Sequence, residues 1–275
     1  MPALAPNCRR RRRTVQILSA ALLLPTFPLS AQAQMALSAA INRAGSFRAL
    51  SQRIVKAYCQ LHLNVLPDKA REVLALSRLQ IASGLADLSR GIAGGAWPAS
   101  VASQLEKLQR EAAALLALLT DPPTRQSVQQ VAQQADRMLA TAQAATEAIE
   151  KLSPAPTAKL VNVSGRQRML SQRMAKGYFL AAAGWADKSL AQAMAADAAT
   201  FLQALADLGR SPISTPAIRA ELQQGENQWM FFDIALRQAA DVNGLRTVAT
   251  TSERLLEVFN HLTDLYDAAL KDVLG

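Results

Sequence analysis

The segment NRAGSFRALSQRIVKAY at residues 42–58 returns as NVSGRQRMLSQRMAKGY at residues 162–178, with nine residues kept at a constant offset of 120 positions. The kept types include asparagine, glycine and glutamine. Two core helices would share an apolar pattern without sharing these polar residues. The repeat therefore indicates a duplicated unit that carries a duplicated polar feature.

The rest of the chain follows the same duplication. Residues 85–90 reappear as residues 205–210 at the same offset, and Asp136-Arg137 resembles Glu253-Arg254 at an offset of 117. Apolar residues recur at spacings of three and four, as in amphipathic helices. Prolines and glycines divide the chain, with breaks near Gly184 and at Asn243-Gly244 in the second half. The pattern predicts helices near 37–65, 68–91, 98–119, 124–152, 158–183, 187–209, 216–240 and 245–273.

This organisation predicts an all-α fold. Alanine, leucine and glutamine dominate, and β-branched runs are scarce. Four amphipathic helices joined by short turns suit an antiparallel four-helix bundle. We expect two tandem four-helix bundles, a first repeat at residues 34–153 and a second at residues 157–275, on either side of a Ser-Pro-Ala-Pro linker. One larger helical bundle of paired hairpins is the alternative.

Residues 1–33 have the composition of a secretory signal peptide. Five consecutive arginines precede a short apolar run, and Ala31-Gln32-Ala33 supplies a cleavage site before Gln34. The apolar run is shorter than the roughly 20 residues that a membrane-spanning helix needs. Cleavage removes five basic residues and no acidic one, so the formal net charge falls from +9 to +4. We therefore expect a periplasmic protein that has no membrane span after cleavage and does not bind nucleic acid.

Few residues suit catalysis. The mature chain keeps one cysteine, Cys59, which is typical of a small core residue. The two histidines form no zinc or haem pattern with it. Two carboxylate pairs, Glu253 with Glu257 and Asp264 with Asp267, are typical of solvated helix faces. We expect no metal, no cofactor and no enzymatic activity.

Projection of the repeated segment onto a helix separates two faces. Phe47, Leu50, Ile54 and Tyr58 gather on the face toward the bundle core, and the repeated polar residues fall on the opposite face. A glycine in the middle of a helix costs about 1 kcal/mol relative to alanine, so its presence suggests close approach of another helix or a ligand. We call the polar face the stripe. It comprises Asn42, Gly45, Arg48, Gln52, Arg53 and Lys56 in the first copy, and Asn162, Gly165, Arg168, Gln172, Arg173 and Lys176 in the second.

The stripes lack negative charge, because neither repeated segment contains Asp or Glu. Arginines that face a contact need anions. Carboxylates of neighbouring helices, such as Asp68, Glu72 or Asp87, are one source. A small external oxyanion held between the two stripes is the other, since the planar guanidinium fork suits a planar, delocalised anion.

Residues 41–48 resemble the periplasmic signature of nitrate/nitrite sensor histidine kinases. Residues 161–174 resemble the related N-terminal sensor domain of type IV pilus methyl-accepting chemotaxis transducers. In the nitrate sensors the signature helix pairs with its counterpart across a dimer, and one nitrate lies between two arginines. By position, the resemblance implies that Arg48 and Arg168 contact the anion and that Gly45 and Gly165 lie beside it.

The resemblance implies a soluble periplasmic sensor or binding protein for a small oxyanion, nitrate or nitrite. The paired arginines belong either to one chain or to two chains of a homodimer. The family's receptors carry transmembrane and output segments, so we expect a protein partner to relay the signal. Ser46 stands against Arg166 in the second copy, a difference that is consistent with loss of binding by one copy. A ligand-independent interaction module in an envelope or pilus-linked sensory complex is the alternative function.

Overall fold

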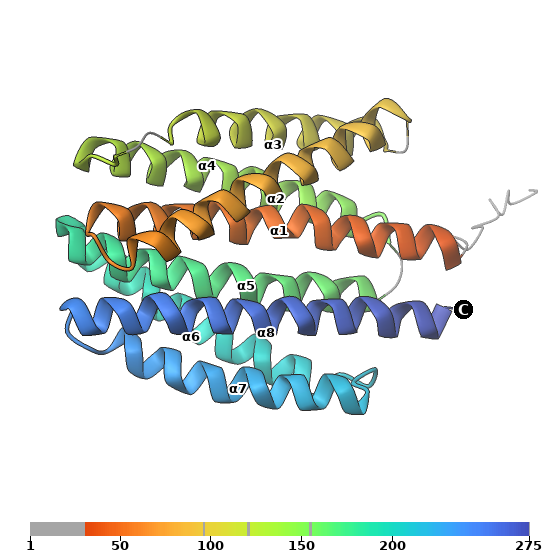
Figure 1. The fold of residues 1–275 in the computed structure, drawn as a ribbon. Helices are drawn as coiled ribbons and strands as arrows, with labels where there is room; N and C mark the ends of the chain where they lie inside the picture. Colours follow the sequence, from red (N-terminus) through yellow and green to blue (C-terminus); the bar gives the residue numbers. More distant parts are fainter. Residues whose placement is uncertain (1–30, 96, 120–121, 154–155, 275) are drawn as a thin grey trace, which may run out of the picture.

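The computed structural model describes residues 31–95, 97–119, 122–153 and 156–274, and these form helices with short connections (Figure 1). The all-α expectation is confirmed. The predicted signal peptide lies outside the described residues except for residues 31–33, which open the first helix. The helices are α1 (Ala31–His62), α2 (Pro67–Ala93), α3 (Ala99–Ala117), α4 (Arg125–Glu150), α5 (Pro156–Leu180), α6 (Lys188–Gly209), α7 (Pro216–Leu236) and α8 (Val242–Leu274), with a π-helical turn η1 (Ala181–Trp185) after α5.

Most helices end near the prolines and glycines that predict their ends. The prediction of a break at Asn243-Gly244 is wrong. The connection before α8 is formed by residues 237–241, and both residues lie in the first turn of the helix. The Asp241 carboxylate accepts the backbone N–H groups of Asn243 and Gly244 at 2.9 Å each. A carboxylate that accepts these N–H groups caps the N-terminus of the helix, so α8 begins before Gly244. Gly244 is needed for close packing, since a Cβ there would lie 2.1 Å from the carbonyl oxygen of Ala239.

Each half contributes four helices that pack in the same order. In the first half α1 contacts α2 and α4, and α3 contacts α4; in the second half α5 contacts α6 and α8, and α7 contacts α8. The halves meet mainly through α1 and α5, which run in the same direction, while α4 and α8 run oppositely beside them (Figure 1). Apolar side chains of both halves form one continuous cluster. Within the described residues, no helix is long and apolar enough to cross a membrane.

The two repeated helices are buried almost all round, which corrects the expected division into a core face and an opposite polar face. Residues 47–60 are buried apart from Arg53, and residues 167–179 are buried apart from Arg173. The predicted core residues Phe47, Ile54 and Tyr58 are buried as expected. Most of the stripe is buried as well, because the other half of the chain packs over it, and only Asn42, Arg53, Asn162 and Arg173 stay half-buried. Projection of one helix could not include that second half.

Candidate functional site

The duplicated arginines meet at the contact between α1 and α5 through reciprocal hydrogen bonds. Arg168 Nη2 donates to Oδ1 of Asn42 at 2.8 Å, and Arg48 Nη2 donates to the backbone oxygen of Asn162 at 3.4 Å. Arg168 is the equivalent of Arg48 and Asn162 the equivalent of Asn42 at the offset of 120, so each arginine contacts the repeated asparagine of the other copy. The contacts therefore follow a pseudo-twofold relation between the copies, and the structure brings the predicted residues Arg48 and Arg168 together.

The stripe glycines make room for the guanidinium groups. Each arginine folds back along its own helix and donates from Nε to the carbonyl oxygen of the glycine three positions earlier, Gly45 or Gly165. A Cβ at Gly45 would lie 2.9 Å from Arg48 Nη2. A Cβ at Gly165 would lie 2.8 Å from Arg168 Nη2 and 3.6 Å from Arg48 Nη2. Both guanidinium groups therefore lie close to a single point beside Gly165.

Arg48 and Arg168 are buried with only neutral hydrogen-bond partners. Arg48 is 0% exposed and Arg168 is 5% exposed. Arg48 Nη1 donates to Oε1 of Gln143 at 2.8 Å, and Arg168 Nη1 donates to Oδ1 of Asn260 at 3.3 Å. Within the described part of the chain, neither guanidinium forms an ion pair with a carboxylate. Two buried positive charges therefore face one another without a counterion.

Burial lowers the pKa of both arginines, and the positive charges of Arg168 and Arg166 lower that of Arg48 further. Burial, followed by the charge of Arg168, lowers the pKa of Arg48 to about 9, against an opposing effect of Glu147 and Glu150. Burial lowers the pKa of Arg168 to about 10, and the charge of Asp264 opposes it. An anion between the two groups would offset both penalties.

The guanidinium groups also keep free donors. Each has five N–H groups, and the described contacts use one on Nε, one on Nη1 and one on Nη2. One N–H therefore remains on each terminal nitrogen of Arg48 and of Arg168.

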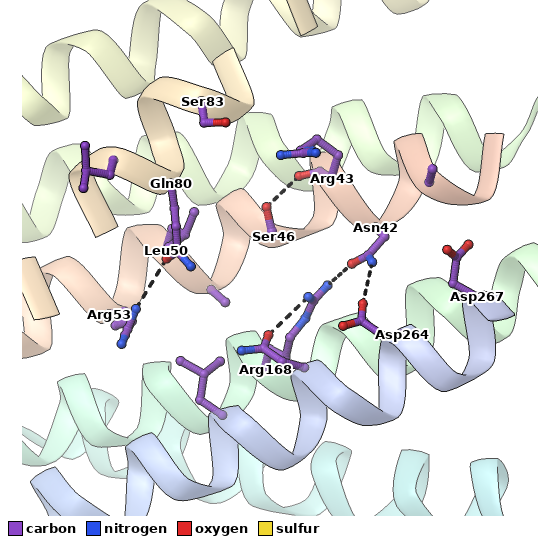
Figure 2. Close-up of a pocket in the computed structure, with 15 residues that line it drawn as sticks. Asn42, Arg43, Ser46, Leu50, Arg53, Gln80, Ser83, Arg168, Asp264 and Asp267 are labelled. Atoms are coloured by element: carbon purple, nitrogen blue, oxygen red, sulfur yellow. Dashed lines mark hydrogen bonds between the residues drawn. The ribbon is translucent and has the colours of Figure 1, made fainter. Parts of the chain in front are cut away.

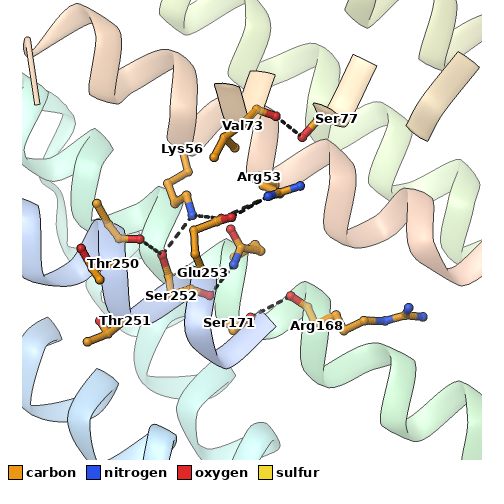
Figure 3. Close-up of polar contacts among 12 residues, drawn as sticks. Arg53, Lys56, Val73, Ser77, Arg168, Ser171, Thr250, Thr251, Ser252 and Glu253 are labelled. Atoms are coloured by element: carbon orange, nitrogen blue, oxygen red, sulfur yellow. Dashed lines mark hydrogen bonds and ion pairs between the residues drawn. The ribbon is translucent and has the colours of Figure 1, made fainter. Parts of the chain in front are cut away.

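The other two basic stripe residues of the first copy form ion pairs with the other half. Lys56 Nζ lies 2.5 Å from Oε1 of Glu253, and Arg53 Nη2 lies 2.5 Å from its Oε2 (Figure 3). Lys56 Nζ also donates to Oγ of Ser252 at 3.0 Å. The interpretation of Glu253 as a solvated surface acid is wrong, since this carboxylate neutralises a fully buried lysine.

The second copy forms a related set of contacts. Lys176 Nζ lies 2.6 Å from Oδ1 of Asp136, on α4 of the first half. Arg173 departs from the pattern, because its Nε donates to Oδ2 of Asp197 on α6 of its own half at 2.6 Å. The other basic residues of the two stripes therefore form ion pairs with carboxylates, unlike Arg48 and Arg168.

The stripe glutamines lie deep in the same contact. Gln52 Nε2 lies 3.5 Å from Asp136, and Gln172 Nε2 donates to the carbonyl oxygen of Ser252 at 2.8 Å. The Oε1 atoms of both glutamines and Oδ1 of Asn162 are buried without a hydrogen-bond partner. These acceptors add to the polar character of the contact.

The carboxylates proposed as counterions do not reach the paired arginines. Asp87 pairs with Arg43 at 2.9 Å, whereas Asp68 and Glu72 pair with basic residues of their own helix α2. Salt bridges thus neutralise the stripe residues Arg53, Lys56, Arg173 and Lys176, but they do not neutralise Arg48 or Arg168.

Sequence reasoning missed Gln143 and Asn260. They lie on α4 and α8, and they occupy equivalent positions at the same offset of 117 that relates Asp136 to Glu253. Extending that offset by two turns would have aligned the two amides. Nothing in their own segments distinguishes them from other polar residues on helices.

Comparisons with known proteins agree with the duplication. A family model described as the type IV pili methyl-accepting chemotaxis transducer N-terminal domain (PilJ) matches the chain twice, over residues 30–155 and 152–251. No curated protein and no solved structure matches the chain. Among the described residues, no group of three or more His, Cys, Asp or Glu side chains could hold a metal ion.

Proposed function

The chain belongs to the family of type IV pili methyl-accepting chemotaxis transducer N-terminal domains, and on that premise we propose that it is a periplasmic sensory protein for a small oxyanion. Nitrate or nitrite is the favoured ligand, held between Arg48 and Arg168. The two repeats, residues 34–153 and 157–275, would then supply one half-site each. A protein partner would carry the signal onward.

One observation carries this proposal: two buried arginines meet without a counterion at the centre of the chain. A buried charge is normally paired, because leaving it unpaired costs free energy. Such strain is retained where it serves binding. A planar oxyanion offers acceptors for the N–H groups that Arg48 and Arg168 leave unused, in charge-assisted hydrogen bonds.

Binding has a mechanical consequence, because Arg48 and Arg168 belong to α1 and α5. Without an anion the two charges repel one another across the contact between the halves. An anion removes this repulsion and bridges the two helices. It thereby favours the state in which the halves are most closely packed, and a partner that contacts both halves can distinguish the two states.

A thermal unfolding assay on the mature chain tests the proposal. Nitrate at millimolar concentration should raise the melting temperature, since a ligand that binds only the folded state stabilises it. Chloride at equal ionic strength should not. Arg48→Gln and Arg168→Gln should remove the nitrate effect, whereas Arg71→Gln should keep it, because Arg71 is an exposed arginine paired with Asp68 on α2. A wild-type protein that responds to neither nitrate nor nitrite contradicts the proposal.

A protein-interaction module is the second candidate, and exposed apolar residues favour it. Met230, Phe231 and Ile234 on α7 are all more than half exposed. They form a surface away from the arginine pair, so docking there would not need the stripe. In that case charge removal at Arg168 would leave partner binding unchanged, and anions would have no effect.

A further inference from the structure

A groove between α1, α2 and α8 leads to Arg168. Its volume is about 690 Å³, and Arg168, Asn42, Asn260 and Asp264 line its polar part. Leu50, Leu79 and Leu256 line its apolar part. A triatomic or tetratomic oxyanion would fill only a small fraction of this space, so the groove has room for a larger molecule.

The polar part of the groove has a positively charged side chain at one end and a negatively charged one at the other. Asn42 lies between Arg168 and Asp264 (Figure 2). Its Oδ1 accepts a hydrogen bond from Arg168 at 2.8 Å, and its Nδ2 donates to Oδ1 of Asp264 at 3.3 Å. The groove therefore presents a cationic donor on one side and an anionic acceptor on the other. The neutral amide of Asn42 satisfies both with partial charges only.

We propose that this groove binds an apolar α-amino acid, with its carboxylate on Arg168, its ammonium group on Asp264 and its side chain against Leu50, Leu79 and Leu256. A zwitterion has the same polarity as the Asn42 amide but carries full charges. It thus replaces two neutral hydrogen bonds by two charge-assisted ones, which are the stronger kind. The Asn42 side chain is half-buried, so it can turn toward solvent when the ligand replaces its two hydrogen bonds.

In the described part of the chain, the equivalent region beside Arg48 has no groove that reaches the arginine. On the other side, Asn162 is the equivalent of Asn42: its backbone oxygen accepts from Arg48, and its Nδ2 donates to Oε2 of Glu150. The order of arginine, asparagine and carboxylate is thus repeated. The pocket there is about 260 Å³, and Arg48 does not line it. Arg166 lines it where Ser46 lines the larger groove. Within the described residues, the proposed amino-acid site therefore has no equivalent on the Arg48 side.

Isothermal titration of the mature chain with three matched probes tests this inference. L-leucine carries both charges, 4-methylpentanoate lacks the ammonium group and 3-methylbutylamine lacks the carboxylate. L-leucine should bind at least about tenfold more tightly than either analogue, because each analogue leaves one charged group of the groove without its partner. Equal affinity for L-leucine and 4-methylpentanoate, or no binding of L-leucine, overturns the proposal.

Two matched variants locate the site. Asp264→Asn should weaken L-leucine binding by about tenfold through loss of a charge-assisted hydrogen bond. Glu150→Gln, the matching change to the carboxylate beside Asn162 on the closed side, should leave it unchanged. Equal weakening by both variants, or none by Asp264→Asn, overturns the assignment.

The nitrate proposal fails or succeeds separately. Nitrate contacts Arg168 but not Asp264 in that proposal, so Asp264→Asn should keep the nitrate response while it loses the leucine response. A wild-type chain that binds L-leucine but not nitrate rejects only the oxyanion function. A chain that binds nitrate but not L-leucine rejects only the groove.

Discussion

The ammonium group of Lys56 lies 2.5 Å from the carboxylate of Glu253, which belongs to the other half of the chain. Lys176 repeats this relation with Asp136, at 2.6 Å. Asp136 and Glu253 occupy equivalent positions in the two repeats. Each repeated helix is thus paired with the last helix of the opposite half. These two ion pairs join the halves about two helical turns beyond the arginine pair.

Glu253→Gln should destabilise the protein by about 3 kcal/mol, because it leaves a buried charge without a partner. The Lys56 side chain is 0% exposed, so water cannot replace the carboxylate. Chemical denaturation measures the loss. Asp68→Asn is the control and should cost at most about 1 kcal/mol, since an exposed ion pair contributes little. The side chains of Asp68 and its partner Arg71 are 98% and 58% exposed. Equal losses in the two variants would contradict the assigned difference in burial.

The same carboxylate predicts a dependence of stability on acid. Burial opposes ionisation of Glu253, but the charges of Lys56 and Arg53 outweigh it and lower its pKa from 4.5 to about 2. A carboxyl group whose pKa is lower in the folded state stabilises the fold above its unfolded-state pKa and loses this effect as the pH falls toward its folded-state pKa. The free energy of unfolding should therefore fall between pH 4.5 and pH 2. Glu253→Gln should show a smaller fall over this window, and an unchanged slope would refute the assignment.

The fold was predictable because its signals are local. Prolines, glycines and the apolar spacing of three and four gave all eight helices. Gly184 ends the first helix of the second half as expected, with a positive φ of 93°. The one misplaced break, at Asn243-Gly244, was decided by the cap at Asp241 rather than by the glycine.

The candidate site was predictable only in part. The repeat singled out Arg48 and Arg168, because residue types kept at a fixed offset stand out in a single sequence. Their burial was not predictable, since it depends on packing between the two halves. Gln143 and Asn260 were missed for the same reason. Each lies more than 90 residues from the arginine that it contacts.

Gly165→Ala should remove the nitrate response while the protein stays folded. The new Cβ would lie 2.8 Å from Nη2 of Arg168, so the guanidinium at the end of a flexible side chain must move away. Thermal unfolding with and without nitrate measures the effect. Gly209→Ala is the control, because a Cβ there meets nothing within 4 Å. It should keep the response and raise stability by up to about 1 kcal/mol through helix propensity. A Gly165→Ala protein with an intact response would show that the guanidinium position is not critical.

Arg48→Met should stabilise the protein without ligand and abolish its response to nitrate. Arg48 is buried beside Arg168 with no carboxylate partner, and burial together with that neighbouring charge lowers its pKa to about 9. Methionine has a similar length and no charge, so the exchange should raise the free energy of unfolding by about 1 kcal/mol or more. Gln143 loses a hydrogen bond, but it is only half-buried and can bond to water instead.

Arg168→Met should behave in the same way, and the double variant separates repulsion from burial. If the two charges repel one another, removal of the second arginine should gain less stability than removal of the first, and the double-mutant cycle should give a coupling energy of about 0.5 kcal/mol or more. Urea denaturation of the four proteins at low ionic strength measures this coupling. Strong destabilisation by either single substitution would mean that the amide partners alone balance the arginines. The pair would then be a structural element, and the case for an anion between Arg48 and Arg168 would be lost.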